Sequence, residues 1–426
     1  MEQNTLPESN SNGQPMESSE QPGGEAPAGA ANNESGSASS RSGPLDSNKL
    51  EKGKSGKGAR VSFASPRFWH GMRFLTFMRL LWNGGFRIHF LGIGMMVAVF
   101  LYSIGNSVLS FVQWIFLGRR INNVKIDKPP VFIVGHWRSG TTLVHELMNL
   151  DENLAAPNTY QCFAPCHFPI TEWCMKPMVG MAMPKTRPMD NMATGPNRPN
   201  EDEFAICALG GPSPYTRMAF PNLPKPHQNL IDMKNVSEED LRNLEHCIEY
   251  FAKALTYKNS GRRLVLKSPT HTGRIEFLRK VFPGAKFLHI SRDPKDVIPS
   301  TVRLWKRLDT INGFQIPSYE ESELENYVGQ TFQKMYVAYE EANSEKHDDL
   351  ATIKYEDLVA NPVESLRGAY GELGLDGFES LEPRLREYME SQSDYKRNQH
   401  QLNDCLREII NQHCGAYQEK YGYEKA

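Results

Sequence analysis

A short polar loop between apolar flanks is the first part of the sequence where chemistry is expected. It reads Gly135-His-Trp-Arg-Ser-Gly140-Thr-Thr and follows the apolar run Val131–Val134. Two glycines at this separation are typical of phosphate-binding loops, in which backbone N–H groups and a helix N-terminus converge on an anion. Thr141 replaces the usual lysine, and Arg138 supplies the positive charge from inside the loop. Alone, the loop fits a glycine-capped strand-to-helix turn equally well.

Two further cations follow apolar runs later in the chain. Lys267 ends the run Arg263–Lys267, and Arg292 comes directly after Lys286–Ser291. Ligands of open α/β sheets bind at the carboxyl ends of parallel strands. We therefore expect Gly135, Lys267 and Arg292 to converge on one anionic ligand.

The segments around these cations alternate between strand and helix patterns. Each apolar run is followed by a polar loop and then by apolar residues at helical spacing, and the first run, Val131–Val134, is rich in β-branched residues. One helical pattern stops at Pro283-Gly284, immediately before the next strand pattern. This alternation predicts an α/β fold of the P-loop type, with three layers around a central parallel sheet.

These motifs resemble those of the sulfotransferases that use 3′-phosphoadenosine-5′-phosphosulfate (PAPS). The loop RSGTTL is similar to the 5′-phosphosulfate loop of that family, in the arginine form of its tyrosylprotein and related bacterial branches. The segment RDPKDVIPS, with seven residues between Arg292 and Ser300, is similar to the family's 3′-phosphate motif. The resemblance extends from about Lys128 to the C-terminus, so residues 128–426 are expected to form a sulfotransferase domain.

The resemblance implies transfer of a sulfuryl group from PAPS, as co-substrate, to a hydroxyl acceptor without a metal ion. Arg138 and Lys267 would act as catalytic cations that stabilise charge on the leaving phosphate oxygen. Tyr355 would lie near the adenine, and a late basic loop would close over the nucleotide. The implied cofactor-binding residues are Arg138, Ser139, Gly140, Thr141, Thr142, Leu143, Arg292, Ser300, Tyr355, Lys396 and Arg397.

The general base for the acceptor hydroxyl cannot be read from the family's patterns. The cytosolic branch places a histidine two residues after the strand-end lysine, where this chain has Pro269. The tyrosylprotein branch places a glutamate beyond the loop arginine, where this chain has the run Asn158–Gln161. Both usual bases are therefore missing.

Other residues become candidates for that base. The acidic run Glu201–Glu203 opens an apolar helix, and because Asn200 with Glu203 fits a helix capping box, the run is explained by capping as well as by catalysis. Within the run we favour Glu203 or Asp202 as the catalytic carboxylate. His271 is the next candidate, and His136 is the last.

The N-terminal part of the chain differs in composition from the rest. Residues 1–60 contain no Phe, Trp or Tyr, and leucine occurs only three times. Such a segment cannot offset its ordering entropy, so we expect a disordered tail. Residues 61–127 are expected to form an amphipathic and apolar helical segment that associates with a membrane. Within it, Ile88–Gly118 contains no Asp, Glu, Lys or Arg and is long enough to cross a bilayer.

Three interpretations of the apolar segment stay open. A single crossing would leave the N-terminus cytoplasmic and place the larger domain on the opposite side. A re-entrant or surface-lying hairpin, interrupted at residues 105–107, would use His89, Asn106 and Gln113 as polar contacts and would favour a catalytic domain on the cytoplasmic face. A hydrophobic helix pair packed on the domain is the third interpretation.

Charge and composition limit the partners. The formal net charge of −2 excludes a generally basic nucleic-acid-binding protein, so no nucleic acid partner is expected. The long insert from Leu150 to Arg262 is rich in Met and aromatic residues and is expected to form the acceptor pocket. An apolar pocket beside a membrane segment suggests a hydrophobic, lipid-like hydroxyl acceptor. The sequence does not indicate an oligomeric state.

Two other functions compete with sulfuryl transfer. The first is a P-loop kinase or NTPase in which Asp293 would bind magnesium, although the missing loop lysine and the pair Arg292 and Ser300 argue against it. The second is a catalytically inactive, membrane-anchored nucleotide-binding protein, because both usual bases are missing.

Overall fold

The computed structural model describes residues 67–183, 194–391 and 402–426. These residues belong to one compact unit, Ala59–Ala426. Residues 67–127 therefore share this unit with the predicted domain 128–426. The predicted tail, residues 1–60, lies outside the described residues, as do the cofactor-binding candidates Lys396 and Arg397.

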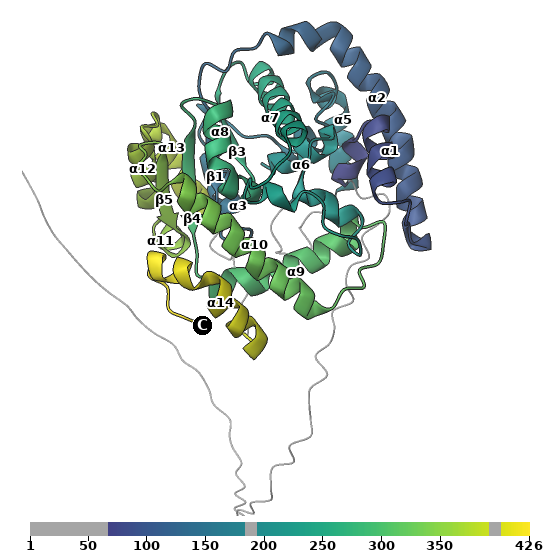
Figure 1. The fold of residues 1–426 in the computed structure, drawn as a ribbon. Coiled ribbons are helices and arrows are strands. Elements are labelled where there is room, and N and C mark those ends of the chain that lie inside the picture. The colour runs from purple at the N-terminus through teal and green to yellow at the C-terminus, as the bar shows by residue number, and fades with distance from the viewer. Residues whose placement is uncertain (1–66, 184–193, 392–401) are drawn as a thin grey trace, which may run out of the picture. The chain divides into compact units, whose positions relative to one another are not determined.

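A sheet of parallel strands lies at the centre of this unit (Figure 1). The strand order is β2-β3-β1-β4-β5, and each neighbouring pair is parallel. The strands are β1 Val131–Val134, β2 Leu154–Ala155, β3 Arg263–Lys267, β4 Lys286–Ser291 and β5 Leu350–Lys354. Every residue of β1 is buried, as expected for a continuous apolar run in the middle of a parallel sheet. The predicted α/β fold with a central parallel sheet is confirmed.

Helices connect and cover the strands. The α-helices are α1 Phe74–Asn83, α2 Ile93–Asn122, α3 Thr141–Met148, α4 Thr159–Phe163, α5 Phe168–Ala182, α6 Asp202–Leu209, α7 Glu238–Lys258, α8 Ile275–Val281, α9 Pro294–Asn312, α10 Glu321–Ala342, α11 Tyr355–Ala360, α12 Pro362–Leu373, α13 Phe378–Ser391 and α14 Asp404–Tyr421. Short 3-10 helices are η1 Phe68–Gly71, η2 Phe90–Gly92, η3 Pro214–Ala219, η4 Gln228–Leu230 and η5 Pro269–Arg274.

The two faces of the sheet pack into two separate cores. Successive residues of a strand point to opposite faces. Val131 and Ile133 accordingly join a core with side chains of α3, α12 and α13. Phe132 and Val134 join a larger core with α6, α7, α10 and α14. Helices thus cover both faces, which gives the predicted three layers.

The N-terminal helices pack against this larger core rather than standing apart from it. α2 runs without a break through residues 105–107, where the hairpin interpretation placed an interruption. The Asn106 amide donates to the backbone oxygens of His70 and Met72 at 2.6 and 3.0 Å. Ser107 accepts from the Phe74 N–H at 2.9 Å. These polar side chains find partners on the inner face of a continuous helix, so no break is needed.

Candidate active site

The loop after β1 contains two residues with positive φ, Arg138 and Gly140, a backbone conformation that favours glycine. Gly140 has φ +107° and is the N-cap of α3, directly before the first residue of that helix. A Cβ at Gly140 would lie 2.4 Å from Cδ2 of Tyr355. Arg138 also adopts a positive φ, +69°, which costs a non-glycine residue about 1 kcal/mol or more. Strain of this kind concentrates at ligand-binding loops.

Four predicted cofactor-binding residues come together at this loop. The Arg138 Nε donates to the Ser300 Oγ at 2.9 Å. A guanidinium nitrogen of Arg292 donates to the backbone oxygen of Arg138 at 3.1 Å. The same guanidinium lies over the ring of Tyr355, 4.1 Å from its centroid, and pairs with Asp296 at 2.9 Å. Arg138 lies in the loop after β1, Arg292 directly follows β4, Ser300 lies in α9 and Tyr355 begins α11 directly after β5, so all four come from segments that follow carboxyl ends of strands.

Two polar atoms of this cluster are ready to bind a ligand. The Ser139 Oγ and the Arg292 Nε are buried and have no hydrogen-bond partner among the residues that the structure describes. A buried polar group without a partner is costly, and a bound anion would satisfy both groups. Thr141, Thr142 and Leu143 form the first turn of α3, where the helix dipole also favours an anion. The cluster therefore fits a polyanionic nucleotide.

Lys267 meets a carboxylate that the sequence pattern did not single out. Its Nζ donates to the Glu201 Oε1 at 2.8 Å, and the Tyr215 hydroxyl donates to the Glu201 Oε2 at 2.6 Å. The indole N–H of Trp137, within the glycine loop, donates to the same Tyr215 hydroxyl at 2.8 Å. Burial and the Glu201 carboxylate raise the pKa of Tyr215 well above its ordinary value, so Tyr215 stays protonated and donates.

Glu201 is placed differently from the two carboxylates that follow it. It precedes α6 in an extended conformation, and its side chain is 17% exposed while that of Lys267 is 1% exposed. Among the described residues, the donors that reach its carboxylate are Lys267 and Tyr215. A carboxylate offers about four lone-pair positions. Glu201 can therefore accept a further hydrogen bond from a substrate.

Glu203, by contrast, has its acceptor positions engaged inside the protein. It accepts from Ser213 at 2.6 Å and from Thr270 at 2.8 Å. Two guanidinium nitrogens of Arg274 add contacts at 2.7 and 3.1 Å, and both side chains of this ion pair are fully buried. Burial alone would raise the pKa of Glu203, but Arg274 and these hydrogen bonds hold it below its ordinary value. This geometry favours a structural role for Glu203.

The other candidate bases are also buried. Asp202 and His271 pair at 2.7 Å, and neither side chain is more than 2% exposed. Burial would raise the pKa of Asp202, but the adjacent His271 holds it below its ordinary value. Burial lowers the pKa of His136 to about 3, and its Nδ1 lies 3.0 Å from the Trp137 backbone oxygen. A histidine with so low a pKa is a weak base.

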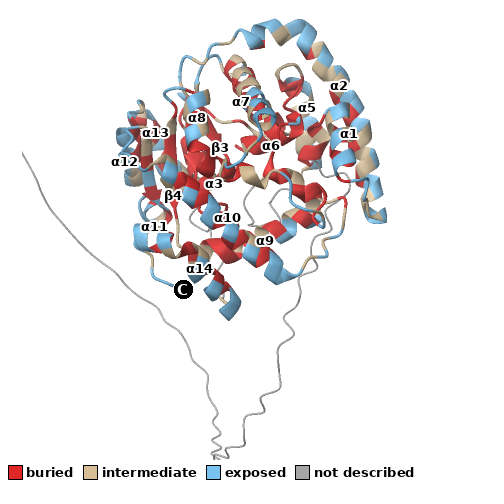
Figure 2. Ribbon diagram, in the orientation of Figure 1, coloured by how far each residue is buried: buried red, intermediate tan, exposed pale blue. Residues whose placement is uncertain are grey.

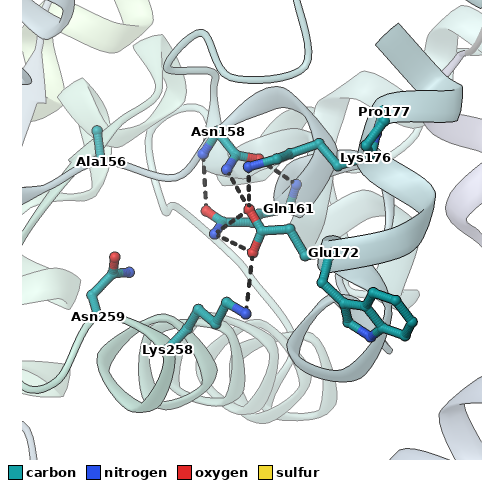
Figure 3. A pocket seen from close by; sticks show the side chains of 9 residues that line it. Ala156, Asn158, Gln161, Glu172, Lys176, Pro177, Lys258 and Asn259 are labelled. Carbon is teal, nitrogen blue, oxygen red and sulfur yellow. Dashed lines mark hydrogen bonds and ion pairs between the residues drawn. The ribbon is translucent and has the colours of Figure 1, made fainter.

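A polar hollow of about 340 Å³ is lined in part by the run Asn158–Gln161, where the tyrosylprotein branch has its glutamate (Figure 3). Asn158 and Gln161 line it, and both donate to the Glu172 carboxylate, at 2.8 and 3.1 Å. Lys176 also donates to Glu172 at 3.1 Å. Trp173, an aromatic residue of the insert that was expected to form the acceptor pocket, borders this hollow and is 78% exposed. The polar groups of the hollow thus bind one another.

Known proteins are similar to this chain over most of its length. Residues 129–380 match the family described as "Sulfotransferase family". The chain is 40% identical over 365 residues to the "Omega-hydroxy-beta-dihydromenaquinone-9 sulfotransferase Stf3" of Mycobacterium bovis and to that of Mycobacterium tuberculosis. Each match covers 85% of this chain and 92% of the relative.

Two solved structures share the fold at low sequence identity. Sulfotransferase STF9 from Mycobacterium avium has a TM-score of 0.61 at 16% identity, over 83% of this chain and 97% of that protein. Sulfotransferase STF1 from Mycobacterium tuberculosis H37Rv has a TM-score of 0.55 at 15% identity, over 80% of this chain and 92% of that protein.

Proposed function

Because this chain belongs to the sulfotransferase family, we propose that it transfers a sulfuryl group from PAPS to the hydroxyl of a lipid-like acceptor. The relatives that are 40% identical are named for a hydroxylated menaquinone derivative, a long apolar molecule with a hydroxyl. The observation that carries the proposal is the cluster of Arg138, Arg292 and Ser300 together with the pair of Lys267 and Glu201, which Tyr215 joins to Trp137 of the same loop.

PAPS fits this cluster as the donor, and when bound it supplies the sulfuryl group. Arg138, the backbone N–H groups of residues 139–143 and Lys267 would hold its 5′-phosphosulfate. Arg292 and Ser300 would hold the 3′-phosphate, which distinguishes PAPS from other adenine nucleotides. Tyr355 would lie beside the adenine. Lys396 and Arg397 belong to the same proposal, although they lie outside the described residues.

Glu201 is the residue that we propose as the general base, in place of Glu203, Asp202 and His271. It is partly exposed, it retains room for a further donor, and Lys267 holds it at the carboxyl end of β3. It would take the proton of the acceptor hydroxyl as that oxygen bonds to sulfur and the bond from sulfur to the phosphate oxygen breaks. Lys267 would stabilise the charge left on the phosphate oxygen.

Membrane association completes the proposal, because a lipid-like acceptor resides in a bilayer. One helical segment among the described residues, Phe90–Asn122, is long and apolar enough to contact or cross a membrane, with a mean hydropathy of 1.8. We place the catalytic domain on the cytoplasmic face, the side favoured if this segment does not cross.

The competing functions receive less support. Asp293, the magnesium ligand of the NTPase interpretation, caps α9 by accepting from the Lys295 N–H at 2.9 Å. A catalytically inactive protein would need no open carboxylate beside the cationic cluster, whereas Glu201 provides one.

Two measurements test the proposed function. Calorimetry should show tight binding of 3′,5′-diphosphoadenosine to the full chain, weakened in Arg292→Gln. Labelled sulfate from PAPS should appear in a hydroxylated polyprenyl quinone, and Lys267→Ala should abolish this transfer. Binding without transfer to any hydroxyl acceptor would support the inactive protein instead. Transfer only to soluble carbohydrates would refute the lipid-like acceptor.

A further inference from the structure

α2 is apolar on two opposite faces, and only one of them packs against the protein. The inner face carries the buried residues Met95, Val99, Ser103, Asn106, Gln113 and Ile121. The opposite face repeats every three or four residues, as one side of a helix does. We name it the outer stripe, and it consists of Val97, Leu101, Ile104, Val108, Phe111 and Ile115.

The outer stripe is exposed throughout. Its side chains are between 44% and 62% exposed. Figure 2 shows α2 as mostly exposed and intermediate along its length, with few buried positions. A surface helix normally turns a polar face outward. An apolar face of this length marks a surface that binds a partner or a membrane.

Exposed aromatic side chains widen this apolar surface. Trp114 of α2 is 65% exposed and stacks against Phe111, with ring centroids 5.9 Å apart. Trp82 at the end of α1 is 76% exposed and packs edge-on against Phe86 at 6.4 Å. Trp and Tyr are enriched where proteins meet the headgroup region of a bilayer.

The charges that flank the outer stripe along the chain have one sign. Residues 67–126 contain seven Lys and Arg and no Asp or Glu. None of the seven lies between Ile88 and Gly118, so the stripe itself is free of charge. Arg87 precedes it, and Arg119 and Arg120 follow it, all three exposed. An uncharged apolar stripe between cations complements an anionic phospholipid surface, with acyl chains below and phosphates at its edges.

The inner face prevents α2 from leaving the protein to cross a bilayer by itself. Gln113 donates to the Cys166 backbone oxygen at 3.1 Å and to the Tyr250 hydroxyl at 2.9 Å. The Asn106 Oδ1 lies 3.0 Å from the His167 Nε2, besides the two bonds of its amide to η1 and the following residue. A crossing would strip these groups of their partners in a medium that supplies none.

We propose that the outer stripe lies flat in the interface of an anionic phospholipid bilayer, so that the protein sits on one face of the membrane without spanning it. The inference rests on the proposed function in that a lipid-like acceptor would then reach the enzyme from the same bilayer. A helix of 30 residues is about 45 Å long and can lie in that plane along its whole length. We therefore expect both termini of the chain to be accessible from the same side of the membrane.

Vesicle sedimentation of the full chain tests the docking. The protein should sediment with vesicles of phosphatidylcholine and phosphatidylglycerol, and a smaller fraction should sediment with vesicles of pure phosphatidylcholine. The double variant Leu101→Gln and Val108→Asn should bind at least about tenfold more weakly, because both side chains would lose their apolar contact. The matched control, Ile316→Gln with Val337→Asn, removes two exposed apolar side chains outside α1 and α2 and should bind as the parent does.

Protease protection tests the orientation. Tags at both termini of the vesicle-bound chain should both be digested by an external protease. One protected tag would mean a crossing and would overturn the proposal. So would equal binding by parent and stripe variant, or a stripe variant that changes only from dimer to monomer, which would assign the surface to a second copy.

Docking and catalysis can fail separately. The stripe variant should keep the parental rate with an acceptor dissolved in detergent and lose activity only with acceptor embedded in vesicles. A protein that binds vesicles but transfers no sulfate would leave the docking intact and refute the proposed function. A protein that transfers sulfate in detergent but never binds vesicles would leave the proposed function intact and refute the docking.

Discussion

Glutamine substitutions at Glu201 and Glu203 separate the proposed chemistry from stability. Glu201→Gln keeps an oxygen that can accept from Tyr215 but removes the negative charge beside Lys267 and the capacity to take a proton. Loss of a general base slows a reaction by about 10²–10⁴-fold. We expect kcat to fall within this range. The unfolding midpoint should fall less than in Glu203→Gln, because the Glu201 carboxylate is 17% exposed, although the buried Lys267 loses the charge of its carboxylate partner.

Glu203→Gln should lower the stability of the protein and leave its transfer rate unchanged. The substitution leaves the Arg274 guanidinium buried without its carboxylate, in a pair whose two side chains are 0% exposed. Removing one partner of a buried ion pair costs about 3–5 kcal/mol. Folded domains have a total stability of about 5–15 kcal/mol, so the loss is a fifth of that stability or more. The molecules that remain folded should transfer sulfate at the parental rate.

Single-turnover transfer of labelled sulfate and urea unfolding at the same pH measure the two effects. Glu276→Gln serves as the control, because Glu276 pairs with Lys280 on the surface and its side chain is 68% exposed. That variant should match the parent in rate and stability. A parental rate in Glu201→Gln, together with a folded Glu203→Gln that has lost its rate by a hundredfold, would refute the assignment of the base.

Three further predictions concern the nucleotide cluster and the sheet. Arg292→Gln should weaken the binding of 3′,5′-diphosphoadenosine by about ten- to a hundredfold in calorimetry. The affinity for 5′-AMP, which lacks the 3′-phosphate, should stay nearly unchanged. Gly140→Ala should abolish nucleotide binding, because its Cβ would meet Tyr355 at 2.4 Å, whereas Gly368→Ala, whose Cβ meets nothing within 4 Å, should bind normally. Burial lowers the pKa of His289 to about 3. Below pH 6.5 this imidazole is therefore protonated in the unfolded chain but stays neutral in the folded chain. Stability to urea should therefore fall by about 1 kcal/mol per such histidine between pH 7.5 and 5.5, and His289→Asn should make this slope shallower.

The sheet and its cations were predictable because their signals are local. A short apolar run followed by a charged or glycine-rich loop indicates the carboxyl end of a buried strand, and parallel strands bring such ends to one edge. Lys267 and Arg292 could be placed in this way, and the structure brings Arg292 to the loop of Arg138. The packing of α2 on the domain could not be predicted as well, because the hydrophobicity of the segment did not show that Asn106 would donate to the protein's own backbone.

The choice among three successive carboxylates could not be made from the sequence. Residues at the start of a helix project about 100° apart, so neighbours face different surroundings. Glu201 precedes α6 and faces Lys267, while the next two residues face His271 and Arg274. These partners lie more than 65 residues away along the chain, and no local pattern records such pairings. The sequence pattern placed all three carboxylates at the start of the helix, whereas in the structure α6 begins at Asp202 and Glu201 is its N-cap.

The outer stripe and the proposed base belong to one packed structure. Asn106 of α2 holds η1 through the His70 backbone oxygen. Phe68 of η1 packs against Phe204 of α6, with ring centroids 5.0 Å apart, and Phe204 packs against Tyr215 at 5.3 Å. Tyr215 in turn donates to the Glu201 carboxylate. Because protein interiors are close-packed and deform little, a bilayer bound by α2 fixes the height of that carboxylate above the membrane. An acceptor anchored in the same bilayer would then present its hydroxyl to Glu201 at a depth set by the fold.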